Sequence, residues 1–316
     1  MQETRRDFMV LDRYLFVYFT GTEETADAEQ VYYALSKDGL HWQDCSNSPV
    51  LRSFIGEKGV RDPYLLRLQN NEGFVLMATD LSIYHRGGWD ASDATVNGSK
   101  NIVFWKSQDL INWSEARLIQ VIPDDTGCAW APEAIFDPER GKYMVFWAST
   151  GFSHQTQAVI IASYTRDFEN FTDPQVYINR GKDKDIIDTT IIKNSTNFIR
   201  ASRDGQISIE YASTLNGKWH KTANIQSLDV GIVGDTVEGP EFCYLSGLDQ
   251  WCLYVDQFAS GKGYLPVLTK NIESSDPSEW YIAEDYDFGK QKKRHGCILP
   301  ISESEYLLIK NSFTGK

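Results

Sequence analysis

Short runs of apolar residues separated by turn-forming residues dominate the chain, and they recur in groups of four. After residue 60 such runs cover 62–68, 74–80, 101–106 and 116–120, with turn residues such as the Asn-Asn-Glu-Gly segment at 70–73 between them. Helical periodicity is nearly absent until Ser302 and Glu305, whose spacing predicts a capping box and a short terminal helix. The pattern predicts an all-β protein made of four-stranded units.

Two motifs repeat along the chain at similar intervals. One begins with Ser or Thr and ends in an aromatic residue, and its copies cover 36–42, 107–113, 165–171, 213–219 and 269–280. The other stands at the start of the first strand of each unit, and its copies begin at Asp62, Ala131, Asp188, Glu238 and His295. Positions 62 and 295 are four units apart, which gives about 58 residues per unit. Five such units fill nearly the whole chain and predict a five-bladed β-propeller.

The two ends of the sequence complement each other. The N-terminal unit reads as a second strand at 14–20, a third at 30–35 and a fourth near Val50, but it has no first strand. The run at 295–301 is an unpaired first strand, so its pairing with the N-terminal strands closes the ring. We therefore expect residues 1–316 to form one propeller domain, with 1–12 as an extension and 302–316 as a short helix and tail. An open pair of β-sandwich sheets is the rival fold, but it does not explain a fivefold repeat.

Composition and charge narrow the ligand class. Lys and Arg number 31 against 44 Asp and Glu, a net charge of −13 that disfavours nucleic acid and anionic membranes as partners. Aromatic residues make up 13% of the chain, which suits sheet packing or stacking on a ring-shaped ligand. A neutral, sugar-like ligand fits this composition better than a phosphorylated one.

The cysteines and the termini indicate little about the function. The five cysteines are odd in number and show no metal-binding spacing, so we expect buried free thiols. No apolar run is long enough to span a membrane. The first twelve residues lack the apolar segment of a signal peptide, so the chain is expected to be cytoplasmic or the processed form of an exported protein.

Ionisable residues occupy the repeat position that a propeller directs to its centre. The first strand of each blade lines the central channel, so the five motif starts should converge, and three of them are carboxylates: Asp62, Asp188 and Glu238. A fourth, His295, is also ionisable, whereas solvated strand starts would need no such grouping. Because grouped acids are costly in a cavity, we expect them to serve chemistry or to hold a cation.

These residues carry a resemblance to glycoside hydrolase family 43, the five-bladed propeller arabinosidases and xylosidases. The matching segments appear in the family's order and cover nearly the whole chain: Val-Arg-Asp-Pro-Tyr at 60–64, Trp-Ala-Pro-Glu at 130–133, Ile-Asp-Thr-Thr at 187–190, Val-Glu-Gly-Pro at 237–240 and Arg-His-Gly at 294–296. Each motif alone is weak, but the five in order at blade spacing are fairly specific.

The resemblance implies a role for each channel residue. Asp62 would be the general base that activates water, Glu238 the general acid, and Asp188 the acid that orients its neighbour and raises the pKa of Glu238. Facing carboxyls with room for a water between them predict inversion at the anomeric carbon. The family often holds a Ca²⁺ or a water cluster near the position of His295, so a structural Ca²⁺ there stays open, and no other cofactor is expected.

Further residues are candidates for binding the sugar. Trp130 would stack on a sugar face or pack between blades. Asp80 and Asp256 each end a second strand near the channel mouth, where they would bind hydroxyls or serve as solvated turn residues. Arg200 falls on the strand beside Asp188 and would hold that carboxylate ionised. His295 completes the set.

Other segments are assigned structural roles. The tryptophans of the first motif are expected to pack within the blades: Trp42, Trp113, Trp219 and Trp280. The basic run at 290–294 reads as a solvated loop. Glu133, near a channel strand, receives no catalytic role. The glycine-rich insertion at 85–101, which includes Trp89, is expected to form one wall of a pocket.

The sequence thus predicts an inverting, exo-acting glycosidase that releases pentose from plant-type polysaccharide or oligosaccharide. An α-L-arabinofuranosidase is the first expectation, and β-xylosidase, exo-galactanase and arabinanase stay open because loops decide between similar sugars. A carbohydrate-binding propeller without turnover and a protein-interaction scaffold are the alternatives from other classes. The scaffold leaves the axial acids unexplained.

Overall fold

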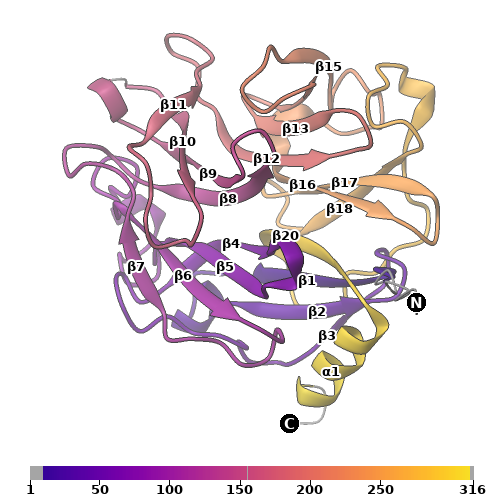
Figure 1. Ribbon diagram of the computed structural model, residues 1–316, viewed down its shortest axis with the longest axis horizontal. Coiled ribbons are helices and arrows are strands. Elements are labelled where there is room, and N and C mark those ends of the chain that lie inside the picture. Colours follow the sequence, from indigo (N-terminus) through magenta and orange to yellow (C-terminus); the bar gives the residue numbers. More distant parts are fainter. Residues whose placement is uncertain (1–9, 155, 314–316) are drawn as a thin grey trace, which may run out of the picture.

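A computed structural model describes residues 10–154 and 156–313, and it shows five four-stranded antiparallel sheets arranged around a central axis (Figure 1). The innermost strands of neighbouring sheets contact one another all the way round the ring. This is the five-bladed β-propeller that the repeats predict. The extension predicted for residues 1–12 and the tail within 302–316 lie partly outside the described residues.

In four of the blades the strands follow one another in chain order from the channel outward. The first blade along the chain holds β4 (Val60–Arg67), β5 (Phe74–Asp80), β6 (Asn101–Ser107) and β7 (Arg117–Gln120). The next holds β8 (Trp130–Asp137), β9 (Lys142–Ser149), β10 (Val159–Thr165) and β11 (Gln175–Ile178). It is followed by β12 (Ile187–Lys193), β13 (Phe198–Arg203), β14 (Ile207–Ala212) and β15 (His220–Asn224). The fourth holds β16 (Glu238–Leu245), β17 (Gln250–Asp256), β18 (Tyr264–Thr269) and β19 (Trp280–Ile282).

The fifth blade closes the ring with strands from both ends of the sequence. Its order is β20 (Arg294–Ile301), β1 (Arg13–Phe19), β2 (Tyr32–Ser36) and β3 (Trp42–Asp44), with β20 antiparallel to β1. This confirms the predicted closure. The fourth strand was predicted near Val50 and that is wrong: it is β3, which carries the motif residue Trp42, while Leu51 forms only an isolated bridge with Val31.

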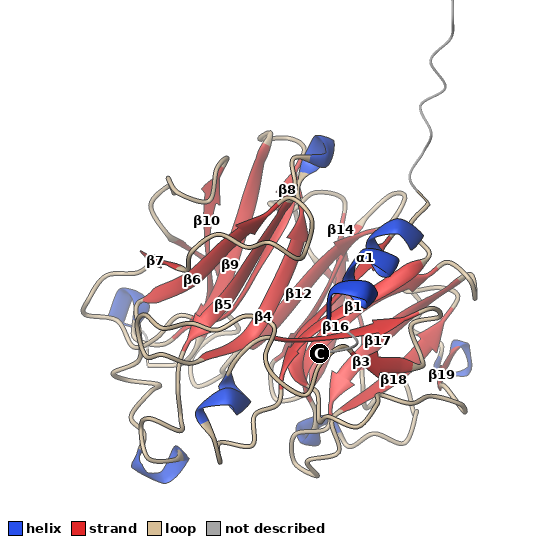
Figure 2. Ribbon diagram, turned by 90° about the horizontal axis from the view of Figure 1, so that it is seen from below, coloured by secondary structure: helices blue, strands red, loops and turns tan. Residues whose placement is uncertain are grey.

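The C-terminal helix α1 (Glu303–Phe313) lies against this closing blade (Figures 1 and 2). Ser302 and Glu305 form the predicted capping box: the Glu305 amide donates to Ser302 Oγ at 3.3 Å, and the Ser302 amide donates to Glu305 Oε2 at 2.8 Å. Tyr306 and Ile309 on the inner face of the helix pack into the core. Within the described residues no helix is long and apolar enough to cross a membrane.

The repeated Ser/Thr motif is a turn with a built-in set of hydrogen bonds. At residues 36–41 the Ser36 hydroxyl accepts the amide of Gly39 at 2.8 Å, and Asp38 Oδ1 accepts the amides of Leu40 and His41. The same pattern recurs at 107–112 and 165–170. Side chains that satisfy the turn's own amides explain why this motif marks each of these blades.

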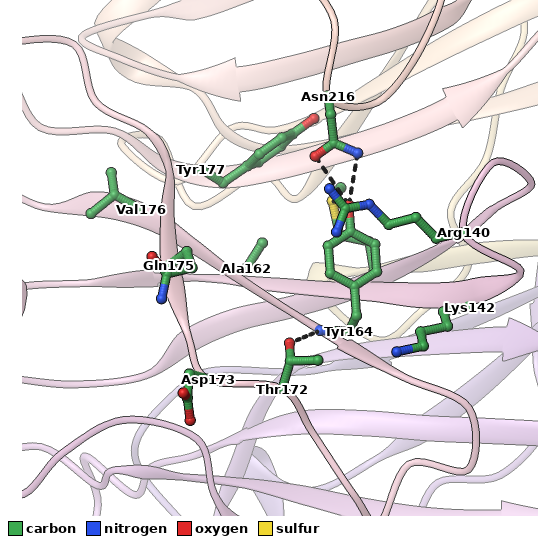
Figure 3. Close-up of a pocket in the computed structure, with 11 residues that line it drawn as sticks. Arg140, Lys142, Ala162, Tyr164, Thr172, Asp173, Gln175, Val176, Tyr177 and Asn216 are labelled. Carbon is green, nitrogen blue, oxygen red and sulfur yellow. Dashed lines mark hydrogen bonds between the residues drawn. The ribbon is translucent and has the colours of Figure 1, made fainter.

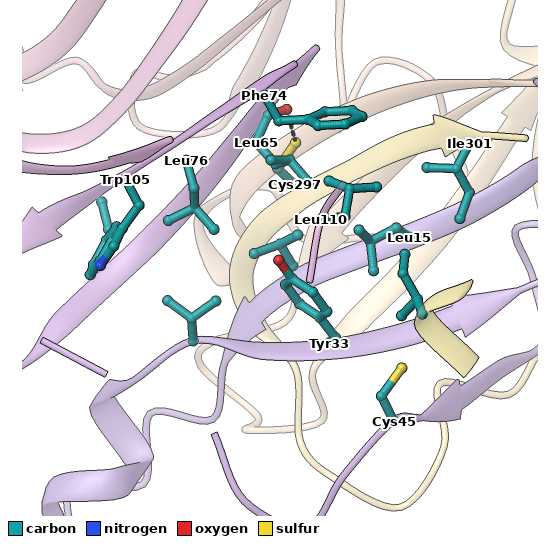
Figure 4. Close-up of a cluster of buried hydrophobic side chains, with 14 of the residues drawn as sticks. Leu15, Tyr33, Cys45, Leu65, Phe74, Leu76, Trp105, Leu110, Cys297 and Ile301 are labelled. Carbon is teal, nitrogen blue, oxygen red and sulfur yellow. Dashed lines mark hydrogen bonds between the residues drawn. The ribbon is translucent and has the colours of Figure 1, made fainter. Parts of the chain in front are cut away.

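Apolar side chains fill the spaces between adjacent blades. Figure 4 shows one such cluster, in which Leu15 and Tyr33 of the closing blade meet Leu65 and Leu76 of the next. The motif tryptophans are buried or partly buried in these clusters, as predicted. All five cysteines are buried free thiols, which was also predicted. The blades are therefore held by ordinary apolar packing, which leaves the polar residues of the channel for other roles.

A β-bulge interrupts the inner strand of every blade at the same level. The strand pairing skips two residues in each case, at 62–63, 131–132, 188–189, 239–240 and 295–296. The first bulge residue has a left-handed backbone in four blades, with φ of 49° at Asp62, 47° at Ala131, 48° at Asp188 and 52° at Gly239. For a residue other than glycine this conformation costs roughly 1–2 kcal/mol. Such strain at one level of the channel marks a functional location.

Candidate active site

The bulges place two consecutive side chains of most blades at one cavity. It has a volume of about 320 Å³, and eight of its lining residues come from the bulge level: Arg61, Asp62, Trp130, Ile187, Asp188, Glu238, Arg294 and His295. Loops supply the remaining four: Glu23, Leu81, Trp89 and Phe258. The three predicted carboxylates and the imidazole therefore converge on one cavity, as the repeats predict.

The repeat position predicted for Glu238 is wrong by one residue. The bulge shows that Gly239, not Glu238, corresponds to Asp62 and Asp188, while Glu238 corresponds to Arg61 one position earlier. Glu238 still reaches the cavity because the residue before the bulge also lines it. A prolyl residue follows the bulge residue in three blades, at Pro63, Pro132 and Pro240, and aligning the motifs on it would have given the correct register.

Asp62 is held in an ionised state at the cavity wall. Its Oδ2 accepts a hydrogen bond from Thr79 Oγ1 at 2.8 Å, and its Oδ1 lies 3.5 Å from His295 Nδ1. Burial acts to raise the Asp62 pKa, but the hydrogen bond and charge of His295 and the charge of Arg61 outweigh it and lower the pKa. A carboxylate in this state is suited to accept a proton from water.

His295 lies between two of the carboxyl groups. Its Nδ1 is 3.8 Å from Asp188 Oδ1, besides the contact with Asp62. Burial acts to lower the His295 pKa, but the charges of Asp188 and Asp62 raise it to about 10. The imidazole is therefore a cation at neutral pH. Asp188 also accepts the amide of Gly239 on its Oδ2 at 3.1 Å, which fixes its orientation toward the neighbouring blade.

Glu238 carries a carboxyl that stays protonated to near neutral pH. Burial is the largest cause, and the charges of Asp188 and Asp256 add to it, so that the Glu238 pKa rises to about 7. Arg294 opposes this shift, because its Nη2 donates to Glu238 Oε1 at 2.9 Å. The cavity thus combines one protonated and one ionised carboxyl, which is the pair that glycosidic bond cleavage requires.

A second acidic layer lies beyond the bulge in the same strands. The residues after the bulges are Tyr64, Glu133, Thr190, Glu241 and Cys297. Glu241 accepts from Thr190 Oγ1 and from the Ile298 amide, both at 3.1 Å. Burial raises the Glu241 pKa to about 7 and, together with the charge of Glu241, raises the Glu133 pKa well above its usual value. Glu133, to which no catalytic role was assigned from the sequence, is therefore a neutral channel residue.

The Ca²⁺ that the resemblance left open near His295 stays a prediction. Among the described residues no group of three or more His, Cys, Asp or Glu side chains is arranged to hold a metal ion. Calcium requires six to eight oxygen ligands, whereas the oxygens of Asp62 and Asp188 face a protonated imidazole and the donors Thr79 and Gly239. The positive charge at this point is supplied by His295 itself.

Three of the predicted sugar-binding residues have other partners. Arg200 does not pair with Asp188, and that prediction is wrong: its Nε donates to Glu210 at 2.7 Å and its guanidinium lies over the Trp219 ring. Asp80 does not line the cavity, because its oxygens accept the Glu57 amide at 2.8 Å and the Ser99 hydroxyl at 2.6 Å.

Asp256 also lies behind the cavity rather than in it. It is fully buried, and its Oδ2 accepts from Arg294 Nε at 2.6 Å. The basic run at 290–294 is not a solvated loop, since Lys293 is buried beside Asp44 and Arg294 binds two carboxyls. The sequence therefore missed Arg294 as a cavity residue, although it stands directly before His295.

Two tryptophans form one wall of the cavity. Trp130 lines it and meets Trp89 edge to face, with ring centroids 6.3 Å apart. Trp89 comes from the insertion that was predicted to build a wall, and 48% of it is exposed. This prediction is supported by the geometry, and the exposed ring offers a stacking surface for a sugar.

A larger cavity of about 620 Å³ lies away from the channel, against the outer strands β10 and β11 (Figure 3). Three of its side chains contact one another: the Tyr164 hydroxyl donates a hydrogen bond to Asn216, and the Arg140 guanidinium lies 4.3 Å from the centre of the Tyr164 ring. Asp173 is the one carboxylate that lines it. It offers no pair of facing carboxyls, so the channel cavity is the candidate active site.

A propeller whose channel cavity is lined by one ionised and one protonated carboxyl has the fold and the acid–base pair of a propeller glycosidase. A family model described as a probable glycosyl hydrolase domain, related to glycosyl hydrolase family 43, matches residues 10–307. The chain therefore belongs to this family.

Similar proteins agree with this assignment. An α-L-arabinofuranosidase of Bifidobacterium longum subsp. longum is 32% identical over 176 residues, which are 50% of this chain and 16% of that protein. The chain thus spans a small part of this relative's length.

Solved structures share the fold at low identity. A thermostable family-43 glycoside hydrolase is 15% identical, with a TM-score of 0.52 over 74% of each chain. An exo-β-1,3-galactanase from Clostridium thermocellum is 12% identical, with a TM-score of 0.52 over 72% of this chain and 49% of its own. The α-L-arabinofuranosidase PaAbf62A from Podospora anserina is 15% identical, with a TM-score of 0.50 over 75% of this chain and 71% of its own.

Proposed function

We propose that this protein is an inverting, exo-acting glycoside hydrolase that releases pentose from plant-type polysaccharide or oligosaccharide, as an α-L-arabinofuranosidase. The observation that carries the proposal is the pairing, in one cavity, of Asp62 with a lowered pKa and Glu238 with a pKa of about 7. The partial similarity to an α-L-arabinofuranosidase favours this sugar.

The two carboxyls divide the chemistry. Glu238 gives its proton to the oxygen of the leaving group as the bond to the anomeric carbon breaks. Asp62 takes a proton from a water molecule, whose oxygen attacks that carbon from the opposite face. Asp188 raises the Glu238 pKa and so keeps this acid protonated, while His295 stabilises both aspartates.

The cavity dimensions support exo action. Its volume of about 320 Å³ is at the lower end of the range for small-molecule sites, which suits a single sugar residue. Because water attacks directly, the released sugar should have the inverted configuration. Proton NMR of the first-formed anomer tests this, and a product of retained configuration contradicts the assignment.

The activity is tested with purified protein on a panel of aryl glycosides. Turnover of p-nitrophenyl α-L-arabinofuranoside, and its loss by about 10²–10⁴-fold in Asp62→Asn, would support the proposal. Asp173→Asn, in the outer cavity, is the matched control and should keep full activity. Turnover of only the β-xylopyranoside or β-galactopyranoside would reassign the sugar within the family.

The competing function is a carbohydrate-binding propeller without turnover. It predicts that the protein binds arabinan, xylan or galactan but hydrolyses none of them and no aryl glycoside. The presence of all three carboxyl groups in one cavity favours the enzyme.

A further inference from the structure

Arg61 is a cavity residue whose charge helps to lower the Asp62 pKa, but the proposed catalytic steps do not use its hydrogen-bond donors. It stands directly before Asp62 on β4 and lines the cavity, with its side chain 6% exposed. Its guanidinium lies over two aromatic rings, 4.6 Å from the centre of Phe19 and 5.2 Å from that of Trp89. Such stacking fixes the plane of the guanidinium while leaving its edge available for hydrogen bonds.

Two carboxylates bind one nitrogen of the Arg61 guanidinium, Nη1. Arg61 Nη1 donates to Glu23 Oε1 and to Glu29 Oε1, each at 2.8 Å. Glu29 is fully buried, and it also accepts from the Ser82 hydroxyl at 2.7 Å and from the Ile83 amide at 2.8 Å. Arg61 is therefore positioned by a buried anchor that also fixes the loop after β5.

The other donors of Arg61 are unused. Both ion pairs leave from Nη1, and within 10–154 and 156–313 no hydrogen bond joins Nε or Nη2 to another residue. A rigid, nearly buried guanidinium with spare N–H groups at a sugar-sized cavity is prepared to donate to a ligand.

We propose that Arg61 is a specificity-determining residue that donates hydrogen bonds to hydroxyl groups of a neutral sugar bound against Asp62. This inference rests on the proposed function and names the sugar groups that the cavity recognises. Two carboxylates already balance the charge of Arg61, and four of the lining residues are acids: Glu23, Asp62, Asp188 and Glu238. Glu238 is protonated, and the other three acids are matched by Arg61, Arg294 and the His295 cation. The cavity therefore has no excess positive charge to hold an anionic sugar such as a uronic acid, and the ligand is a neutral glycosyl unit.

Arg61→Lys is the test variant, because it keeps the positive charge beside Asp62 and removes the planar set of donors. The matched control is Arg67→Lys. Arg67 likewise pairs with a glutamate, Glu305, at 2.7 Å and lies 4.7 Å from the centre of the Phe74 ring, but it does not line the cavity.

Rates are measured on p-nitrophenyl α-L-arabinofuranoside and its 2-, 3- and 5-deoxy analogues. The wild type should disfavour at least one deoxy analogue in kcat/KM by about 10–100-fold, the loss of a charge-assisted hydrogen bond. Arg61→Lys should lose that discrimination and Arg67→Lys should keep it. Unaltered discrimination in Arg61→Lys, or none in the wild type, would overturn the inference.

Thermal unfolding separates this role from a structural one. A purely structural Arg61 predicts a lower Tm for Arg61→Lys with every deoxy discrimination intact, which counts against the inference. If the wild type hydrolyses no glycoside, the proposed function fails, and calorimetric titration with L-arabinose, D-xylose and D-galactose decides the matter for Arg61. Affinity at least tenfold weaker in Arg61→Lys supports its role in binding, whereas equal affinities or no binding by either protein reject it.

Discussion

Arg294 donates a hydrogen bond from Nη2 to Oε1 of Glu238 over 2.9 Å. A cation at this distance favours the ionised carboxylate, yet the Glu238 pKa is raised to about 7 because burial and the charges of Asp188 and Asp256 outweigh it. The pKa of the proposed acid thus results from opposing effects, and Arg294 keeps it from rising further.

Removing the charge of Arg294 should extend activity to higher pH. In Arg294→Met the Glu238 pKa rises further, so the acid stays protonated longer and the basic limb of kcat/KM moves up by about one pH unit. Arg294→Lys keeps a charge and should shift the limb less. Arg140→Met, in the outer cavity, is the control. A basic limb that stays in place in Arg294→Met would show that Glu238 does not govern it.

Loss of the acid should depend on the leaving group. In Glu238→Ala, hydrolysis of an arabino-oligosaccharide is expected to fall by about 10²–10⁴-fold, because its sugar leaving group must be protonated. Hydrolysis of 2,4-dinitrophenyl α-L-arabinofuranoside should fall much less, because this anion leaves unaided. Comparison of kcat/KM for the two substrates checks this. An unchanged rate on the oligosaccharide would remove Glu238 as the acid.

Glu241 should make the fold less stable as the pH rises. Burial raises its pKa from 4.5 to about 7, so the folded state holds a proton that the unfolded state has released. The stabilisation is complete below about pH 4.5 and is lost as the pH passes 7, on the order of 3 kcal/mol in total.

Urea unfolding at pH 5 and pH 8 measures this effect. Glu241→Gln should reduce the difference between the two pH values while keeping partners for Thr190 and Ile298. Part of the difference remains because the pKa values of Glu133, Glu238 and His295 are also raised. Glu279→Gln, on an exposed turn, should behave like the wild type. A pH dependence of undiminished size in Glu241→Gln would show that Glu241 does not contribute to it.

Gly296 should be intolerant of a side chain. A Cβ at this position would lie 2.1 Å from the Val17 carbonyl oxygen and 2.9 Å from Tyr18 Cα, both backbone atoms of the strand that closes the ring. Gly296→Ala is expected to destabilise the protein by about 2 kcal/mol or more.

Thermal or urea unfolding of Gly296→Ala against Gly247→Ala provides the comparison, because a Cβ at Gly247 meets no atom within 4 Å. The control should change the free energy of unfolding by less than about 0.5 kcal/mol. Equal effects of the two substitutions would mean that closure of the ring tolerates local displacement.

The number of blades, their closure and the meeting of Asp62, Asp188 and Glu238 could all be predicted from the sequence. These features depend on periodicity, and a repeat of about 58 residues constrains the whole fold. Strand β5 (Phe74–Asp80) was predicted to the residue because its apolar run ends at clear turn signals.

Side-chain partners could not be predicted in the same way. Arg200 and Asp80 lie on the expected strands, but their hydrogen bonds go to Glu210, Glu57 and Ser99, which the fold brings near from other segments. The bulge had a second effect, because an extra residue reverses the alternation of side chains. Arg61 and Arg294, which strict alternation turns away, therefore reach the cavity.

The bulge at the channel mouth also separates what a blade contributes to chemistry from what it contributes to the architecture. The five inner strands resume regular pairing immediately beyond it, whatever side chains occupy the first bulge position and the position before it. One blade presents Arg61 and Asp62 there and its neighbour presents Trp130 and Ala131, on the same backbone course. A scaffold of this kind can acquire a new substrate by exchanging a residue pair in a single blade, while the other four keep the ring intact.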